Sequence, residues 1–117
     1  MEYLNQIKLR GVVGRAEITT PGENRKCRFS VVTEYCYKQG GESVVETTWF
    51  KLGAWEGRNK PDLTQLQPGI WVEVTGRVRT YKYEGADGVE KSGWEVLANT
   101  VEILPREDSP MQPQRNY

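Results

Sequence analysis

Hydrophobic and polar residues alternate in five stretches of the chain, and such alternation is typical of β-strands that bury one face. The predicted strands cover residues 4–13, 26–34, 44–55, 70–83 and 94–104. Only residues 56–68 favour a helix: Leu63 and Leu66 give this stretch one apolar edge, and Pro61 suits a first helical position. The pattern therefore predicts an all-β chain with one short helix between its third and fourth strands.

Turn-forming residues separate these strands. Gly11 and Gly14 interrupt the first strand, as glycines do at a bulge or a barrel corner. Residues 20–24 form a turn, residues 38–43 a flexible polar loop, and Asp87-Gly88 within residues 84–93 indicates a hairpin. The order of elements matches a five-stranded Greek-key barrel of the oligonucleotide/oligosaccharide-binding (OB) type.

Length and composition exclude several classes of protein. A chain of 117 residues fits one domain, which we place at residues 1–104, followed by a short flexible tail at 105–117. It has no histidine and only two cysteines, so neither a metal site nor a cofactor is expected. No apolar signal region or membrane-length stretch occurs, which favours a cytoplasmic protein. No carboxylate pair or phosphate-binding loop is placed by the sequence, so an enzyme is not expected.

The third predicted strand has two chemically different faces. Phe50 and Leu52 belong to an ordinary core face, whereas Trp49, Lys51 and Trp55 share the other. Aromatic rings beside a cation suit nucleobases and phosphates. Taken alone, the strand favours a different interpretation, a two-sided buried strand whose tryptophans pack under a loop.

Further aromatic residues extend this pattern. The aromatics outside the predicted core are Tyr35, Tyr37, Trp49, Trp55, Tyr81 and Tyr83. Each lies near one of the basic residues Lys38, Lys51, Arg79 and Lys82. A barrel would bring these segments to one wall, where rings stack on bases and cations neutralise phosphates.

Each of these residues also has a structural explanation. Tyr81 and Tyr83 fit cross-strand pairs of a hairpin, and Arg79 fits a solvated face. Trp71 and Trp94 are assigned to the core or to a subunit contact. Net charge is zero, with a pI near 6.3, so any affinity for nucleic acid has to be local.

Four segments resemble the bacterial single-stranded DNA-binding proteins. They are LNQIKLRGVVGRAE, RFSVVT, ETTWFKLGAW and QPGIWVEVTGRVRTYKYEGADGVEKSGWEV, and the resemblance as a whole covers residues 4–104. Their joint spacing is far more specific than any single motif. Ala16 stands where the family usually has proline.

The resemblance implies an OB fold, usually assembled as a homotetramer, that binds single-stranded DNA without sequence preference in replication, recombination or repair. Trp49, Trp55 and Tyr83 match stacking aromatics of the family. Lys51, Arg79 and Lys82 match positions that contact the DNA backbone. A further stacking aromatic falls at Tyr35 or Tyr37, because the loop is shortened here.

The C-terminus departs from the family. Members commonly end in an acidic tip that recruits replication and repair proteins, whereas this chain ends in Gln-Arg-Asn-Tyr. The expected function is non-enzymatic, sequence-independent binding of single-stranded DNA at the nucleoid. The alternative is a primosome-like OB accessory protein that acts mainly through a protein partner.

Overall fold

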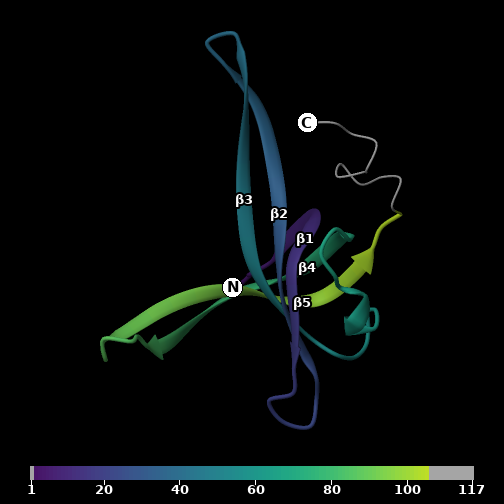
Figure 1. Ribbon diagram of the computed structural model, residues 1–117, viewed down its shortest axis with the longest axis vertical. Helices are drawn as coiled ribbons and strands as arrows, with labels where there is room; N and C mark the ends of the chain where they lie inside the picture. The colour runs from purple at the N-terminus through teal and green to yellow at the C-terminus, as the bar shows by residue number, and fades with distance from the viewer. Residues whose placement is uncertain (1, 106–117) are drawn as a thin grey trace.

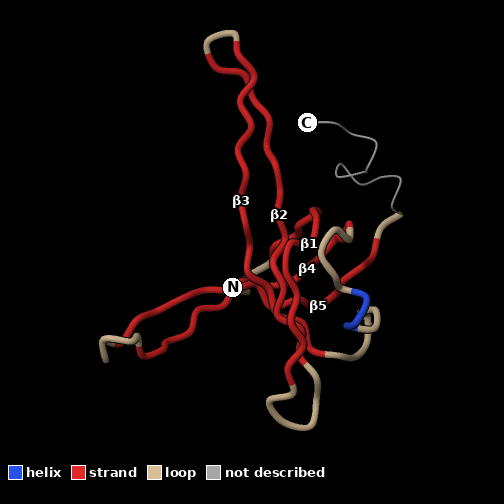
Figure 2. Tube along the Cα trace, viewed as in Figure 1, coloured by secondary structure: helices blue, strands red, loops and turns tan. Residues whose placement is uncertain are grey.

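The computed structural model describes residues 2–105, so the expected tail at residues 105–117 lies outside the described residues except for its first member. Five long strands make up almost all of the described chain, as Figure 2 shows. They are β1 (Ile7–Thr19), β2 (Lys26–Gln39), β3 (Glu42–Trp55), β4 (Trp71–Glu84) and β5 (Glu90–Ile103). The all-β prediction is confirmed.

The five strands close into a barrel in the order β1-β2-β3-β5-β4. All neighbours run antiparallel except β3 and β5, which are parallel and pair only through Leu52 with Val96 and Gly53 with Leu97. This seam between β3 and β5 is the shortest joint of the barrel. The arrangement is the five-stranded OB barrel that the sequence predicts (Figure 1).

The first strand is longer than predicted. It bends at Gly14 and continues to Thr19, so the predicted end at residue 13 is wrong. The register with β2 shifts between Val13 and Arg15, which leaves Gly14 as a bulge. The strand pairs with β4 from Ile7 to Val12 and with β2 from Val12 to Thr19, on both sides of the bulge. The expectation that a glycine marks a barrel corner is therefore confirmed at Gly14.

The β2–β3 and β4–β5 hairpins extend beyond the barrel as long arms that point in different directions (Figure 1). The expected flexible loop at residues 38–43 is wrong, because β2 and β3 are joined by a tight turn at Gly40 and Gly41. Both glycines have positive φ, 60° and 84°, which glycine adopts without steric cost. The expected hairpin at Asp87-Gly88 is confirmed, and it joins β4 to β5.

The segment between β3 and β4 is not the helix predicted for residues 56–68. Its helical part is a single 3-10 turn, Leu63–Gln65, which Asp62 caps through its side chain. Positive φ values at Gly57 and Asn59 interrupt the backbone before this turn. Leu63 and the following Leu66 are nevertheless buried, so the predicted apolar edge is correct although the helix is not.

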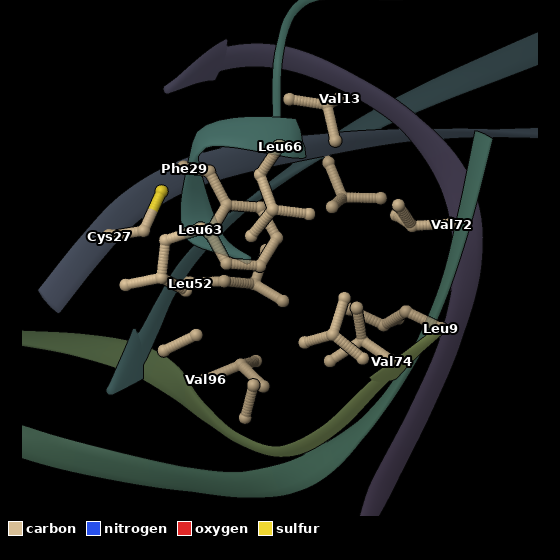
Figure 3. Close-up of a cluster of buried hydrophobic side chains, with 14 residues drawn as sticks. Leu9, Val13, Cys27, Phe29, Leu52, Leu63, Leu66, Val72, Val74 and Val96 are labelled. Atoms are coloured by element: carbon tan, nitrogen blue, oxygen red, sulfur yellow. The ribbon is translucent and has the colours of Figure 1, made fainter. Parts of the chain in front are cut away.

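The predicted core faces are confirmed inside the barrel. Phe29, Leu52 and Val74 come from three different strands, and Leu63 and Leu66 pack against them (Figure 3). Each of these side chains is at most 4% exposed. Alternate residues of the same strands point outward, so the barrel presents its polar and aromatic residues on the outer surface.

The two remaining tryptophans do not belong to the core. Trp94 is 48% exposed and meets Phe50 edge to face, with the ring centroids 6.5 Å apart. Trp71 is partly buried at the start of β4. A place in the core is thus wrong for Trp94. Within residues 2–105, no helix is long and apolar enough to cross a membrane.

Candidate nucleic-acid interface

A groove of about 1140 Å³ crosses the outer surface of the barrel. Four of the predicted binding residues line it, namely Trp49, Lys51, Arg79 and Tyr83. They come from β3 and β4, which are not neighbours in the barrel. The groove is therefore the place where the sequence-predicted aromatic and basic residues meet.

Trp49 is the most exposed tryptophan of the described chain, with 60% of its surface accessible. Its ring lies against Gly14, and a β-carbon on that glycine would overlap the ring. Gly14 is also the bulge residue of β1. The bulge thus provides a support on which a flat ring stays open to solvent, as base stacking requires.

Three cations of the groove have no acid within ion-pair distance among residues 2–105: Arg15, Arg28 and Lys51. Arg15 pairs across the sheet with Ser30, and Ser30 pairs with Lys51. Residues opposite one another on neighbouring strands share a face, so Arg15 and Lys51 lie on the same face about 10 Å apart. Cations spaced in this way suit a polyanion.

Arg79 is held by an acid instead. Its Nε and Nη2 atoms lie 2.8 and 2.7 Å from one oxygen, Oε1 of Glu95. Lys26, which is only 6% exposed, reaches the same oxygen at 3.7 Å. Glu95 is thus a salt-bridged carboxylate that two cations approach.

Trp55 does not line the groove. It pairs with Lys26 across β2 and β3, and the Lys26 ammonium lies 5.4 Å from its ring centre. This is a cation–π contact. With 37% of its surface exposed, Trp55 keeps an open face next to the groove rather than within it.

Two tyrosines lie on the β4 side of the groove. Tyr81 and Tyr83 are neighbours on one face of β4, with ring centroids 6.0 Å apart and planes tilted by 41°. Each also has a cross-strand partner in the β4–β5 hairpin, Gly93 for Tyr81 and Lys91 for Tyr83, so the expected hairpin pairing is confirmed. Lys82 points to the other face, where it forms a solvent-exposed ion pair with Glu90 at 3.3 Å.

Tyr35 and Tyr37 lie outside the groove, on the β2–β3 arm. Their rings stack with centroids 6.0 Å apart and planes 29° from parallel. Tyr35 pairs with Glu46, whereas Trp49 pairs with Val32. Strand alternation therefore places the tyrosines on the opposite face of the arm from Trp49.

Sequence reasoning missed several residues of the groove. Arg15, Arg28 and Glu17 lie on β1 and β2 beside the predicted residues. The excess of basic residues in the first thirty positions is the available signal, since alternation would have put Arg15 and Glu17 on one face had the strand been extended past residue 13. No sequence signal identified Lys26 as a buried partner of Glu95.

Charge in the groove is positive although the chain as a whole is neutral. Four basic and two acidic side chains line it, an excess of two positive charges. Within residues 2–105, no group of three or more histidine, cysteine, aspartate or glutamate residues is placed to hold a metal ion. The arrangement offers exposed aromatic rings, which suit base stacking, and cations, which suit phosphates.

Comparisons with known proteins concern nearly the whole described chain. A sequence model of the single-strand binding protein family matches residues 4–104. The chain is 30% identical over 104 residues to a single-stranded DNA-binding protein of Neisseria meningitidis, covering 86% of this chain and 60% of the relative. It is 33% identical over 107 residues to that of Treponema pallidum, covering 89% and 60%. The chain thus spans about 60% of the length of these relatives.

Solved structures show the same fold. The SSB of Plasmodium falciparum, in complex with ssDNA, superposes with a TM-score of 0.72 at 22% identity, covering 90% of this chain and 98% of the other. A deletion mutant of the single-stranded DNA binding protein from Thermus aquaticus gives 0.70 at 23% identity, covering 87% and 51%. At these identities the likeness concerns the fold.

Proposed function

The chain belongs to the single-strand binding protein family, and from this premise we propose that it binds single-stranded DNA without sequence preference. Such binding protects single strands during replication, recombination or repair. The protein then acts on DNA in the cytoplasm, at the nucleoid. Its role is that of a binding protein rather than an enzyme.

The observation that carries this proposal is the position of exposed Trp49 beside cations without acidic partners. Stacking of one base on an aromatic ring contributes about 1–3 kcal/mol and tolerates every base. Lys51 and Arg15 on the same face are available to phosphates on either side of a stacked base. Duplex DNA hides its base faces, so this chemistry favours single strands.

The remaining predicted residues extend the proposed path of the DNA. From Trp49 the strand continues along the groove to Tyr83, where Tyr81 gives a second ring. The strand passes Trp55 at one border of the groove. Tyr35, Tyr37 and Lys82 lie farther out on the two arms, where they contact DNA that is long enough to extend beyond the groove.

We propose a homotetramer as the functional assembly. Among residues 2–105, the outer parts of both arms have strand edges without a neighbour, and unpaired edges are commonly covered by another subunit. Trp94 is half exposed and adds apolar surface that a subunit contact would bury. Light scattering at micromolar concentration should give four times the chain mass, and a monomer mass would contradict this assembly.

Titration with oligothymidylate while following tryptophan fluorescence tests the main proposal. Stacking on Trp49 should quench emission, and a duplex of equal length should cause much less quenching. Strong binding of plain oligonucleotides at low salt distinguishes this function from a primosome-like accessory protein, which would bind them weakly and require a protein partner. Equal affinity for duplex and single strands would contradict the proposal.

A further inference from the structure

The Glu95 carboxylate lines the groove and lies close to two cations. Both Arg79 nitrogens, Nε and Nη2, point at its Oε1 atom, and the Lys26 ammonium approaches the same atom. The glutamate side chain is only 11% exposed, whereas the Arg79 side chain is 46% exposed. A buried anion thus holds a cation that itself remains accessible from the groove.

Glu95 and Lys26 also span the seam between β3 and β5. Lys26 comes from β2 and Glu95 from β5, on either side of β3. Their side chains meet above Gly53, where a β-carbon would lie 2.8 Å from Cε of Lys26. Only glycine at position 53 leaves room for the Lys26 side chain to reach Glu95. The ion pair therefore joins β2 to β5 at the shortest joint of the barrel.

We infer that Glu95 acts as an internal substitute for a DNA phosphate, stabilising the barrel while it restrains Arg79 from the DNA. The inference rests on the proposed function and assigns Glu95 as a residue that sets affinity. The Nε–H group of Arg79 donates to Oε1 of Glu95 and Nη2 lies 2.7 Å from the same oxygen, so the guanidinium turns toward the carboxylate the donor groups with which arginine also binds phosphate. A phosphate that approaches Arg79 has to share it with Glu95 or displace it.

The charges around the site support this role. Among residues 2–105, Arg79 is the one cation of the groove that has an acid within ion-pair distance. A phosphate drawn to Arg79 also meets the negative charge of Glu95, and repulsion is strong where water is largely excluded. Glu95 thereby lowers the affinity for single-stranded DNA, while its pairing with buried Lys26 favours the folded barrel.

The two roles of Glu95 predict that Glu95→Gln lowers the stability of the protein but raises its affinity for single-stranded DNA. We expect the melting temperature of the variant to fall, because Lys26 loses its ion-pair partner. We expect its affinity for oligothymidylate at low salt to rise on the order of tenfold, because Arg79 becomes free for a phosphate. The slope of log affinity against log salt should steepen by about 0.7, the value of one further neutralised phosphate. A merely structural residue would lower affinity when it is replaced.

A double-mutant cycle identifies the cation through which Glu95 acts. In an Arg79→Ala background, Glu95→Gln should give no gain in affinity. Glu17→Gln removes an equal charge from the same groove, but Glu17 forms no ion pair among residues 2–105. Its gain should be smaller and should persist with Arg79→Ala, because it acts through general electrostatics. Equal gains from the two glutamine variants, or a Glu95→Gln gain that survives Arg79→Ala, would overturn the inference.

A second variant covers the case in which Glu95→Gln does not fold. Lys26→Met combined with Glu95→Gln removes both buried charges together, which spares the barrel an unpaired buried cation. This variant should also bind more tightly and with a steeper salt slope than the wild type. If it folds and binds no better, the inference fails. If the wild type itself does not bind single strands, the proposed function fails instead.

Discussion

The indole ring of Trp49 lies against the backbone of Gly14, and a β-carbon at position 14 would overlap its Cζ3 atom and lie 3.0 Å from Cη2. Gly14 is the bulge of β1, whereas Trp49 lies on β3, two strands away. A backbone irregularity of one strand therefore decides where a stacking surface of another strand is held.

This contact predicts that Gly14→Ala weakens DNA binding without unfolding the barrel. The added methyl group forces the Trp49 ring out of its position, so we expect a loss of up to one stacking interaction, about 1–3 kcal/mol. Gly22→Ala is the matched control, because no atom lies within 4 Å of the added carbon there. Oligothymidylate titration and thermal melting of both variants measure the two effects. Wild-type affinity in Gly14→Ala would show that the ring moves freely.

Substitution of Trp49 and of Trp55 by alanine should affect the melting temperature differently. Trp49→Ala should weaken binding by about 1–3 kcal/mol and leave the melting temperature nearly unchanged, because the ring is largely exposed. Trp55→Ala should weaken binding as well, but it should also lower the melting temperature, because Lys26 loses its cation–π partner. Identical melting profiles for the two variants would contradict this division.

Tyrosines of the β2–β3 arm should matter only for long strands. Tyr35 and Tyr37 lie on the opposite face of the arm from Trp49, so a strand confined to the groove does not reach them. Tyr37→Ala should therefore weaken binding of an oligonucleotide of about 16 nucleotides more than one of about 8, sizes within the range that OB folds cover. Comparable losses at both lengths would place Tyr37 on the groove path.

Strand alternation explains why much of the groove could be predicted. Trp49 and Lys51 lie on one face of β3 by alternation alone, and the barrel fold brings Arg79 and Tyr83 to the same side. Alternation within a strand contains no information about partners across strands. The ion pair of Lys26 with Glu95 depends on the β3–β5 seam and on the gap above Gly53, which only the folded barrel creates.

The arms and the connecting segment show where local propensity was insufficient. Gly40-Gly41 was interpreted as part of a loop, but two residues of positive φ also make the tightest hairpin turn. The helix predicted before Pro68 failed because the segment bends at Gly57 and Asn59. Its leucine spacing reflected burial over the end of the barrel rather than helical structure.

Acid should weaken the link between the start of β2 and the end of β3. A hydrogen bond from the Arg25 side chain, 2.7 Å long, holds the pKa of Glu56 below its ordinary value of 4.5. A lowered pKa in the folded state means that this stabilisation is complete above about pH 4.5 and is lost as the pH falls through the folded value. Glu56→Gln should thus be less stable than the wild type near pH 7, and the difference should shrink as the pH falls below 4.5 and through the folded value. Urea unfolding over a series of pH values measures it, and a difference that does not shrink in acid would exclude the ion pair as its cause.

The salt dependence of DNA affinity distinguishes the contribution of cations from that of aromatic rings. Each phosphate of a single strand that a protein cation neutralises adds about −0.7 to the slope of log affinity against log salt. Stacking of a base on a ring releases no counterion and adds nothing to this slope. Lys51 has no acid within ion-pair distance among residues 2–105, so Lys51→Ala should reduce the slope by nearly the full value. Arg79 is already compensated by Glu95, so Arg79→Ala should reduce it by less.

Trp49→Ala provides the control for this measurement. Its affinity should fall by a similar factor at every salt concentration, and its slope should stay near that of the wild type, because the ring carries no charge. Titrations at four or more salt concentrations give the slopes of all three variants. If the tryptophan and lysine variants changed the slope alike, phosphate contact and base stacking would not be divided between these side chains, even though the barrel and its groove were described correctly.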